Sequence, residues 1–103
     1  MHLQDSQATT LRRGLVYSDE RLTRDVQEVA SLDSGIKLYR FRYRWNATEY
    51  VGVMAQDIAK LLPDAVSKDA DGYLLADYHR LGLQLRLYQD WLQKGHLPTT
   101  AAS

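Results

Sequence analysis

A strict alternation of aromatic and basic residues between Leu38 and Trp45 limits what this chain can fold into. Successive side chains of a strand point to opposite faces, so a period of two predicts a half-buried strand. Residues 46–48 indicate a turn, and residues 49–54 predict the returning strand of a hairpin. The aromatic side consists of Tyr39, Phe41, Tyr43 and Trp45, and the basic side consists of Arg40, Arg42 and Arg44.

The flanking segments predict short helices and a second, smaller hairpin. Apolar residues at helical spacing follow Asp19 and predict a short N-terminal helix. Residues 55–62 predict another short helix, which Pro63 ends. Segments 65–67 and 73–75 flank a turn and predict the second hairpin. The helical spacing rests on Leu22, Val26 and Val29 in the first helix, and Ile58, Leu61 and Leu62 supply the buried side of the second.

The segment from about Asp77 to Lys94 is expected to form one long C-terminal helix that ends at Gly95. Its apolar residues recur at spacings of three and four, which is typical of a heptad seam. A second apolar stripe runs beside the seam. The pattern fits a core helix packed on its own sheet, and it also fits self-association, because an uncovered apolar face invites a partner. The seam consists of Tyr78, Leu81, Leu85, Tyr88 and Leu92, and the second stripe of Leu83, Leu87 and Trp91.

Together these elements predict an α+β fold in a single domain, since the chain has 103 residues. Residues 1–17 predict a polar lead-in that is loose unless a partner orders it, and residues 96–103 predict a tail. The domain itself is expected to span residues 18–95. The chain has no apolar run that could cross a membrane and no signal-peptide layout at its start, so we expect synthesis in the cytoplasm.

Metal, cofactor and nucleic-acid sites are not expected. The three histidines lie far apart, and none pairs at metal-ligand spacing. Residues 67–78 faintly resemble a calcium loop, but Ser67 and Tyr78 stand where acidic ligands are needed. The formal net charge is zero, whereas phosphate binding favours a basic surplus. A base-stacking platform also needs aromatic and basic residues on one face, and here they occupy opposite faces.

Taken alone, Ser18-Asp19 before a helical pattern indicates a cap. In combination with five ordered blocks downstream, however, it resembles the intramolecular chaperone auto-processing domain of phage endosialidases, tail spikes and tail fibres. The resemblance covers about Ser18 to Leu92. The blocks after the opening Ser18–Leu22 motif are the alternating strand and residues 51–57, 62–66, 71–74 and 77–78, followed by a leucine-rich helix.

The resemblance implies a homotrimer with the long C-terminal helix at its three-fold axis. Such domains help an upstream β-helical fibre or spike segment to fold, here in cis or in trans, and then cut themselves away. The resemblance implies Ser18 as the nucleophile and Tyr17–Ser18 as the bond cut, with Asp19 and Arg21 in the same motif. The family's base is a lysine five positions after the serine, and Thr23 stands there.

A threonine hydroxyl cannot take the proton of Ser18, and the adjacent Arg24 stays protonated. Losing a general base costs a factor on the order of a hundred to ten thousand in rate. We therefore predict slow or absent self-cleavage, which leaves open whether the chain acts as an enzyme. One alternative is an active autoproteolytic serine peptidase in which another group replaces the base. The other is a plain oligomerisation or interaction domain.

Overall fold

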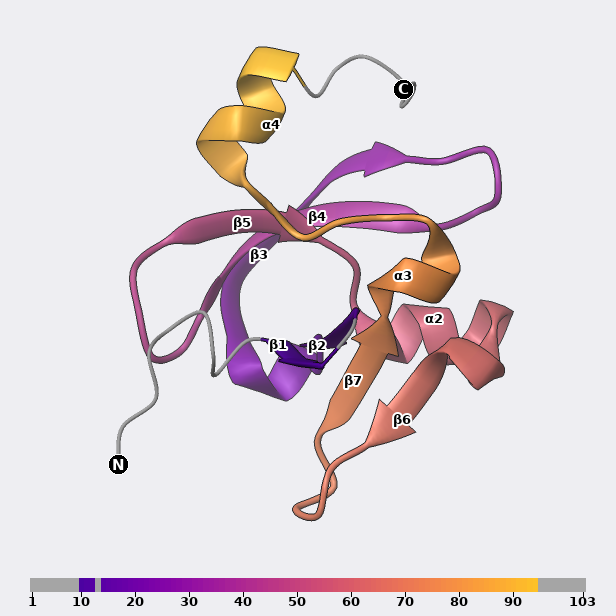
Figure 1. Ribbon diagram of the computed structural model, residues 1–103. Coiled ribbons are helices and arrows are strands. Elements are labelled where there is room, and N and C mark those ends of the chain that lie inside the picture. The colour runs from indigo at the N-terminus through magenta and orange to yellow at the C-terminus, as the bar shows by residue number, and fades with distance from the viewer. Residues whose placement is uncertain (1–9, 13, 95–103) are drawn as a thin grey trace.

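The computed structural model describes residues 10–12 and 14–94, and two four-stranded sheets enclose its core (Figure 1). Short helices lie at the ends and edges of the sheets. This mixture of sheet and helix is compatible with the predicted α+β class. Within the described residues, no helix is long and apolar enough to cross a membrane.

The first sheet has the strand order β3–β4–β5–β8 and is antiparallel throughout. The inner strand β4 bears out the alternation as far as Tyr43, because Phe41 and Tyr43 are fully buried on the face toward the second sheet, which we call the inner face. Trp45 lies past the end of β4 and is exposed, so the expectation that it joins the buried side is wrong. The returning strand is also confirmed as β5. The strands are β3 (Thr23–Ser31), β4 (Lys37–Tyr43), β5 (Glu49–Gly52) and β8 (Arg86–Leu87).

The predicted N-terminal helix is wrong beyond its first turn. A single 3₁₀ turn, η1 (Glu20–Leu22), follows Asp19, and the chain then extends into β3. The β-branched residues Val26 and Val29 favour a strand, and pairing with β4 outweighs their helical spacing. Asp25 has a φ of 56° and lies where the register between β3 and β4 shifts. This irregularity interrupts the alternation of side chains that would otherwise indicate a strand.

The second sheet has the strand order β1–β2–β7–β6. Its β6–β7 pair confirms the second predicted hairpin. The strand β2 falls within the segment expected to be a loose lead-in, yet it pairs with β7 and buries Val16 in the core. The strands are β1 (Thr10–Arg12), β2 (Leu15–Tyr17), β6 (Val66–Lys68) and β7 (Leu74–Asp77).

The helix α2 (Ala55–Leu61) confirms the expected helix before Pro63, and η2 (Pro63–Ala65) follows it. Ile58 is fully buried, as predicted. The expectation that Leu61 and Leu62 are also buried is wrong, because both side chains are almost half exposed. They lie at the end of α2, where the chain turns into η2 before entering β6.

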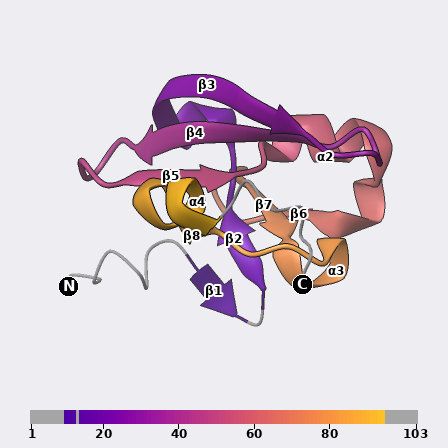
Figure 2. The same ribbon diagram turned by 90° about the horizontal axis from the view of Figure 1, so that it is seen from above.

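The predicted long C-terminal helix is wrong. The segment forms the short helix α3 (Tyr78–Leu81), then β8, then α4 (Tyr88–Lys94). Gly82 ends α3 with a φ of 72°, a left-handed conformation that glycine adopts without steric cost. The chain then crosses the edge of the first sheet by pairing β8 with β5, and α4 lies on the sheet's outer side (Figures 1 and 2).

The heptad residues therefore do not form one continuous seam. Tyr78 is buried, and Leu81 and Leu85 pack against the chain's own core. Tyr88 and Leu92 lie on α4, beyond the edge strand, and the Leu92 side chain is exposed. A trimeric coiled coil along this segment is not supported. Whether any of these side chains contacts another copy stays a prediction.

Candidate self-cleavage site

The Tyr17–Ser18 peptide bond lies in the core, where β2 ends. Ser18 has no exposed surface. Its backbone N–H donates to the Leu74 carbonyl at 3.2 Å, and its carbonyl accepts from the Ala55 N–H at 2.8 Å. The predicted cleavage point is thus held between β7 and the start of α2, rather than in an exposed linker.

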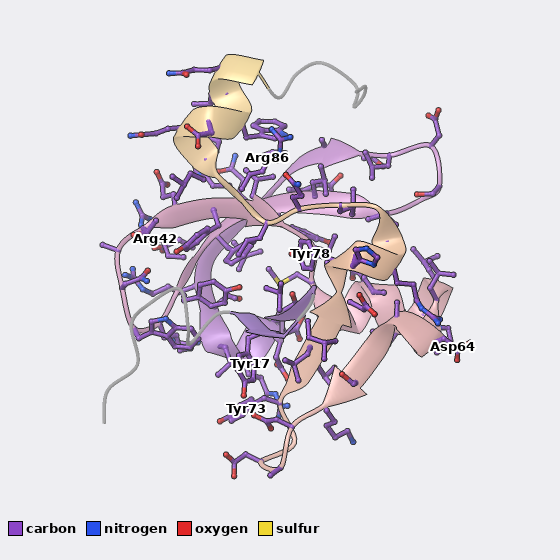
Figure 3. The ribbon with its side chains drawn as sticks, in the orientation of Figure 1. Tyr17, Arg42, Asp64, Tyr73, Tyr78 and Arg86 are labelled. Carbon is purple, nitrogen blue, oxygen red and sulfur yellow. The ribbon has the colours of Figure 1, made fainter. Side chains whose placement is uncertain are left out.

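The Ser18 hydroxyl contacts oxygen atoms that do not act as bases at neutral pH. It donates to the Val16 carbonyl at 3.2 Å and lies beside the Tyr78 hydroxyl. Burial raises the pKa of Tyr78 to about 12, against hydrogen bonds with the Val53 N–H and Ser18 that lower it. Gly52 makes room for this phenol, because a Cβ there would lie 2.2 Å from the Tyr78 oxygen. Figure 3 shows Tyr78 in the middle of the molecule.

Thr23 is buried at the start of β3 and faces the same region. Its hydroxyl donates to the Glu20 carbonyl at 2.9 Å and lies 3.9 Å from the Met54 sulfur. Met54 immediately precedes Ala55, which binds the Ser18 carbonyl. Thr23 is also paired directly with Tyr43 on β4, so the two side chains share the inner face. Position 23 is therefore linked to the bond through Met54 and Ala55 and through its pairing with Tyr43, but its threonine supplies no base.

A residue that the sequence placed only among the core aromatics reaches the Tyr17–Ser18 bond directly. The Tyr43 hydroxyl donates a hydrogen bond to the Tyr17 carbonyl oxygen at 2.6 Å. Burial, with Tyr78 and Tyr50 nearby, raises the pKa of Tyr43 well above its usual value, so the phenol keeps its proton. The one signal in the sequence is a tyrosine at a fully buried strand position, since a buried phenol usually needs a partner for its hydroxyl.

A family model described as chaperone of endosialidase matches residues 18–67. The resemblance to the endosialidase chaperones is confirmed over these residues. The match begins at Ser18 and includes Thr23, Tyr43 and all of α2. No curated protein and no solved structure matches the chain.

Asp19, the second residue of the endosialidase-chaperone match, has a structural role. Its fully buried carboxylate caps η1 by accepting the Arg21 N–H at 2.8 Å, which bears out the capping signal. It also accepts from the Gln56 side chain and the Leu74 N–H, both at 2.9 Å, and from the Arg21 guanidinium. Burial opposes its charge, but these hydrogen bonds hold the pKa of Asp19 well below its usual range. One carboxylate thus joins η1, α2 and β7 next to Ser18.

Arg21 completes this connection from the surface. Its Nη2 lies 2.6 Å from the Asp19 carboxylate and also donates to the Gly72 carbonyl at 2.9 Å. The guanidinium lies over the Tyr73 ring, 4.9 Å from the ring centre. The nearby Tyr17 hydroxyl donates to Asp69 at 2.8 Å, so both sides of the predicted cleavage point contact the β6–β7 hairpin (Figure 3).

The arginines of β4 lie on the opposite face, which we call the outer face of the first sheet. Arg42 pairs with Asp25 at 2.9 Å and with Glu49 at 3.3 Å. Arg40 donates to Gln27 and lies over the ring of Tyr88 on α4. Among the described residues, no group of three or more acidic, histidine or cysteine side chains could hold a metal ion.

Proposed function

We propose that this chain is a trimerising folding-chaperone module for an upstream β-helical fibre or spike segment, of phage or prophage origin and made in the cytoplasm. It carries the family's self-cleavage site in a silenced form. The Tyr17–Ser18 bond stays intact, or is cut only slowly, because Thr23 occupies the position of the base. The match to the endosialidase chaperones supports the chaperone role.

The observation that carries the silenced site is the pair of hydrogen bonds that the two hydroxyls make to backbone carbonyls. Ser18 donates to the Val16 carbonyl, and Thr23 donates to the Glu20 carbonyl. A serine hydroxyl becomes an effective nucleophile only when a nearby base removes its proton. Both hydroxyls instead satisfy backbone oxygens, which favours a stable site over a reactive one.

The proposed client-holding role is supported by β2 and by the exposed apolar residues. The chain reaches Ser18 through β2, which pairs with β7, so a client joined before it would be anchored to the module by strand pairing. Leu87 and Leu92 near α4, and Leu61 and Leu62 at the end of α2, offer apolar surface for assembly. Bringing three chains together raises their local concentration before slow β pairing begins.

Intact mass under denaturing conditions tests the silenced site. We expect the natural chain at full length and the Thr23→Lys variant converted to residues 18–103. A lysine that loses its proton in this buried position can take the Ser18 proton. Thr23→Met fills the same space without an amine and should remain whole, and adding Ser18→Ala to Thr23→Lys should abolish cutting. A natural chain already cut before Ser18 would contradict the proposal and favour the active peptidase.

Co-expression with an upstream β-helical segment tests the chaperone role. We expect that segment to form a soluble trimer only when the module is present. A segment that forms the same trimer alone would instead favour a plain interaction domain.

A further inference from the structure

The Tyr43 side chain is fixed in place by neighbouring rings. Its ring packs edge-on against Phe41 at 5.1 Å and against Tyr50 at 5.4 Å, and it stacks on Trp45 at 4.7 Å. Tyr43 has no exposed surface. Its hydroxyl therefore holds a defined position 2.6 Å from the Tyr17 carbonyl oxygen, instead of selecting among several partners.

We propose that Tyr43 is a catalytic hydrogen-bond donor for the Tyr17–Ser18 bond: it polarises the Tyr17 carbonyl and holds the oxyanion that forms when Ser18 attacks. This inference rests on the proposed function, because it assigns a second group to the same silenced site. A donor already aimed at the oxygen where charge develops needs no rearrangement during the reaction. Its hydrogen bond strengthens when that oxygen becomes an anion.

The chemistry at this bond proceeds through an ester. The Ser18 Oγ bonds to the Tyr17 carbonyl carbon while its proton passes to the base, which in the Thr23→Lys variant is the lysine amine. The carbonyl electron pair moves onto the oxygen held by Tyr43. The carbon–nitrogen bond then breaks, the Ser18 nitrogen takes the proton from the base, and an ester joins Tyr17 to the Ser18 Oγ. Water cleaves that ester, giving a Tyr17 carboxylate and restoring the Ser18 hydroxyl.

A base at position 23 and the Tyr43 hydroxyl could act on the same bond, because β3 and β4 place these two residues directly opposite each other. Side chains in such a pair share one face, and lysine and tyrosine are of similar length. A lysine at position 23 would thus reach the neighbourhood of the Tyr43 hydroxyl and the bond that it contacts. The natural chain keeps the donor and lacks the base.

The cleavage rate of Thr23→Lys is the first measurement. Adding Tyr43→Phe should slow cleavage about a hundred- to a thousandfold, the usual effect of removing one oxyanion donor. Adding Tyr39→Phe is the matched control, since Tyr39 lies on the same strand and face but donates to Asp57. That variant should cut at the rate of Thr23→Lys alone. The proposal would be overturned if Thr23→Lys cut at the same rate alone, with Tyr43→Phe and with Tyr39→Phe. It would also be overturned if the two phenylalanine changes slowed cleavage equally.

If Thr23→Lys is not cut, that result counts against the silenced site and leaves the role of Tyr43 to a second measurement. Tyr17–Ser18 is the only tyrosine–serine pair in the sequence, so carbonyl-labelled tyrosine with nitrogen-labelled serine gives a single correlated NMR signal. In the natural background, Tyr43→Phe should move the Tyr17 carbonyl shift upfield, and Tyr39→Phe should leave it in place. A carbonyl signal that Tyr43→Phe does not move, in a folded chain, would overturn the inference.

Discussion

The two faces of β4 differ in what their side chains hold together. On the inner face, Phe41 and Tyr43 are fully buried, and Tyr43 reaches a carbonyl on another sheet. On the outer face, Arg40 and Arg42 keep about a third of their side-chain surface exposed and pair with neighbouring carboxylates. One seven-residue strand thus carries both the core of the candidate site and a solvated surface. Substitutions on the inner face should therefore change stability and cleavage chemistry much more than substitutions on the outer face.

The largest loss of stability is expected from Phe41→Ala on the inner face. Removing a fully buried aromatic ring from a close-packed core costs about 3–5 kcal/mol. The change also removes the edge-on contact that positions Tyr43. Denaturant unfolding followed by circular dichroism checks the value. A loss no larger than that of an outer-face change would show that the two faces of β4 contribute equally to stability.

A smaller loss, and a distinct pH dependence, are expected from Asp19→Asn. The amide offers fewer acceptor sites to the Arg21 guanidinium and the Leu74 N–H, which should cost about 1–3 kcal/mol. The folded pKa of Asp19 is depressed, so the folded state binds fewer protons than the unfolded chain. Its contribution is complete above the unfolded carboxyl pKa of about 4, and it is lost as pH falls toward the lower folded pKa.

Unfolding curves at neutral and acidic pH check this prediction. The gap in stability between the natural chain and Asp19→Asn should narrow as the pH falls below about 4. Asp71→Asn, an exposed change on the β6–β7 turn, serves as the control. A gap that stays constant with pH would show that the Asp19 charge contributes nothing.

The smallest effect is expected from Arg42→Ala on the outer face. Its ion pairs with Asp25 and Glu49 are partly exposed, and such pairs contribute about 0–1 kcal/mol. Any loss should shrink further at high salt, because ions screen exposed charges. Thermal melts at low and high salt measure both effects. A salt-independent loss above about 2 kcal/mol would exceed the usual contribution of exposed ion pairs. It would show that the outer face contributes to stability as strongly as the buried inner face.

The β4–β5 hairpin could be predicted because its signal is local. Alternation marks both faces of β4, and the turn residues mark its end. The C-terminal segment could not, because its apolar spacing of three and four fits a helix equally well. Gly82 ends that helix in a left-handed conformation, and β5 captures the residues after Leu85 as an edge strand. The helix end at Gly82 is a local effect of glycine, whereas the pairing of β8 with β5 is tertiary, and apolar periodicity encodes neither.

The candidate site was only partly predictable for a similar reason. Ser18 and Thr23 were found through a motif that lies within six residues of sequence. Tyr43 reaches the Tyr17 carbonyl from β4, and Tyr78 lies beside the Ser18 hydroxyl from α3. These partners become apparent only when the sheets pack. A sequence pattern shows that Tyr43 is buried, but it does not show which carbonyl its hydroxyl contacts.

The intact mass of the natural chain, followed over time beside Thr23→Lys, shows whether Thr23 keeps the Tyr17–Ser18 bond intact. We expect that the natural chain remains at full length while the variant yields residues 18–103. A natural chain that cuts itself before Ser18 as fast as the variant would contradict this expectation, because Thr23 would then not be what keeps the bond intact.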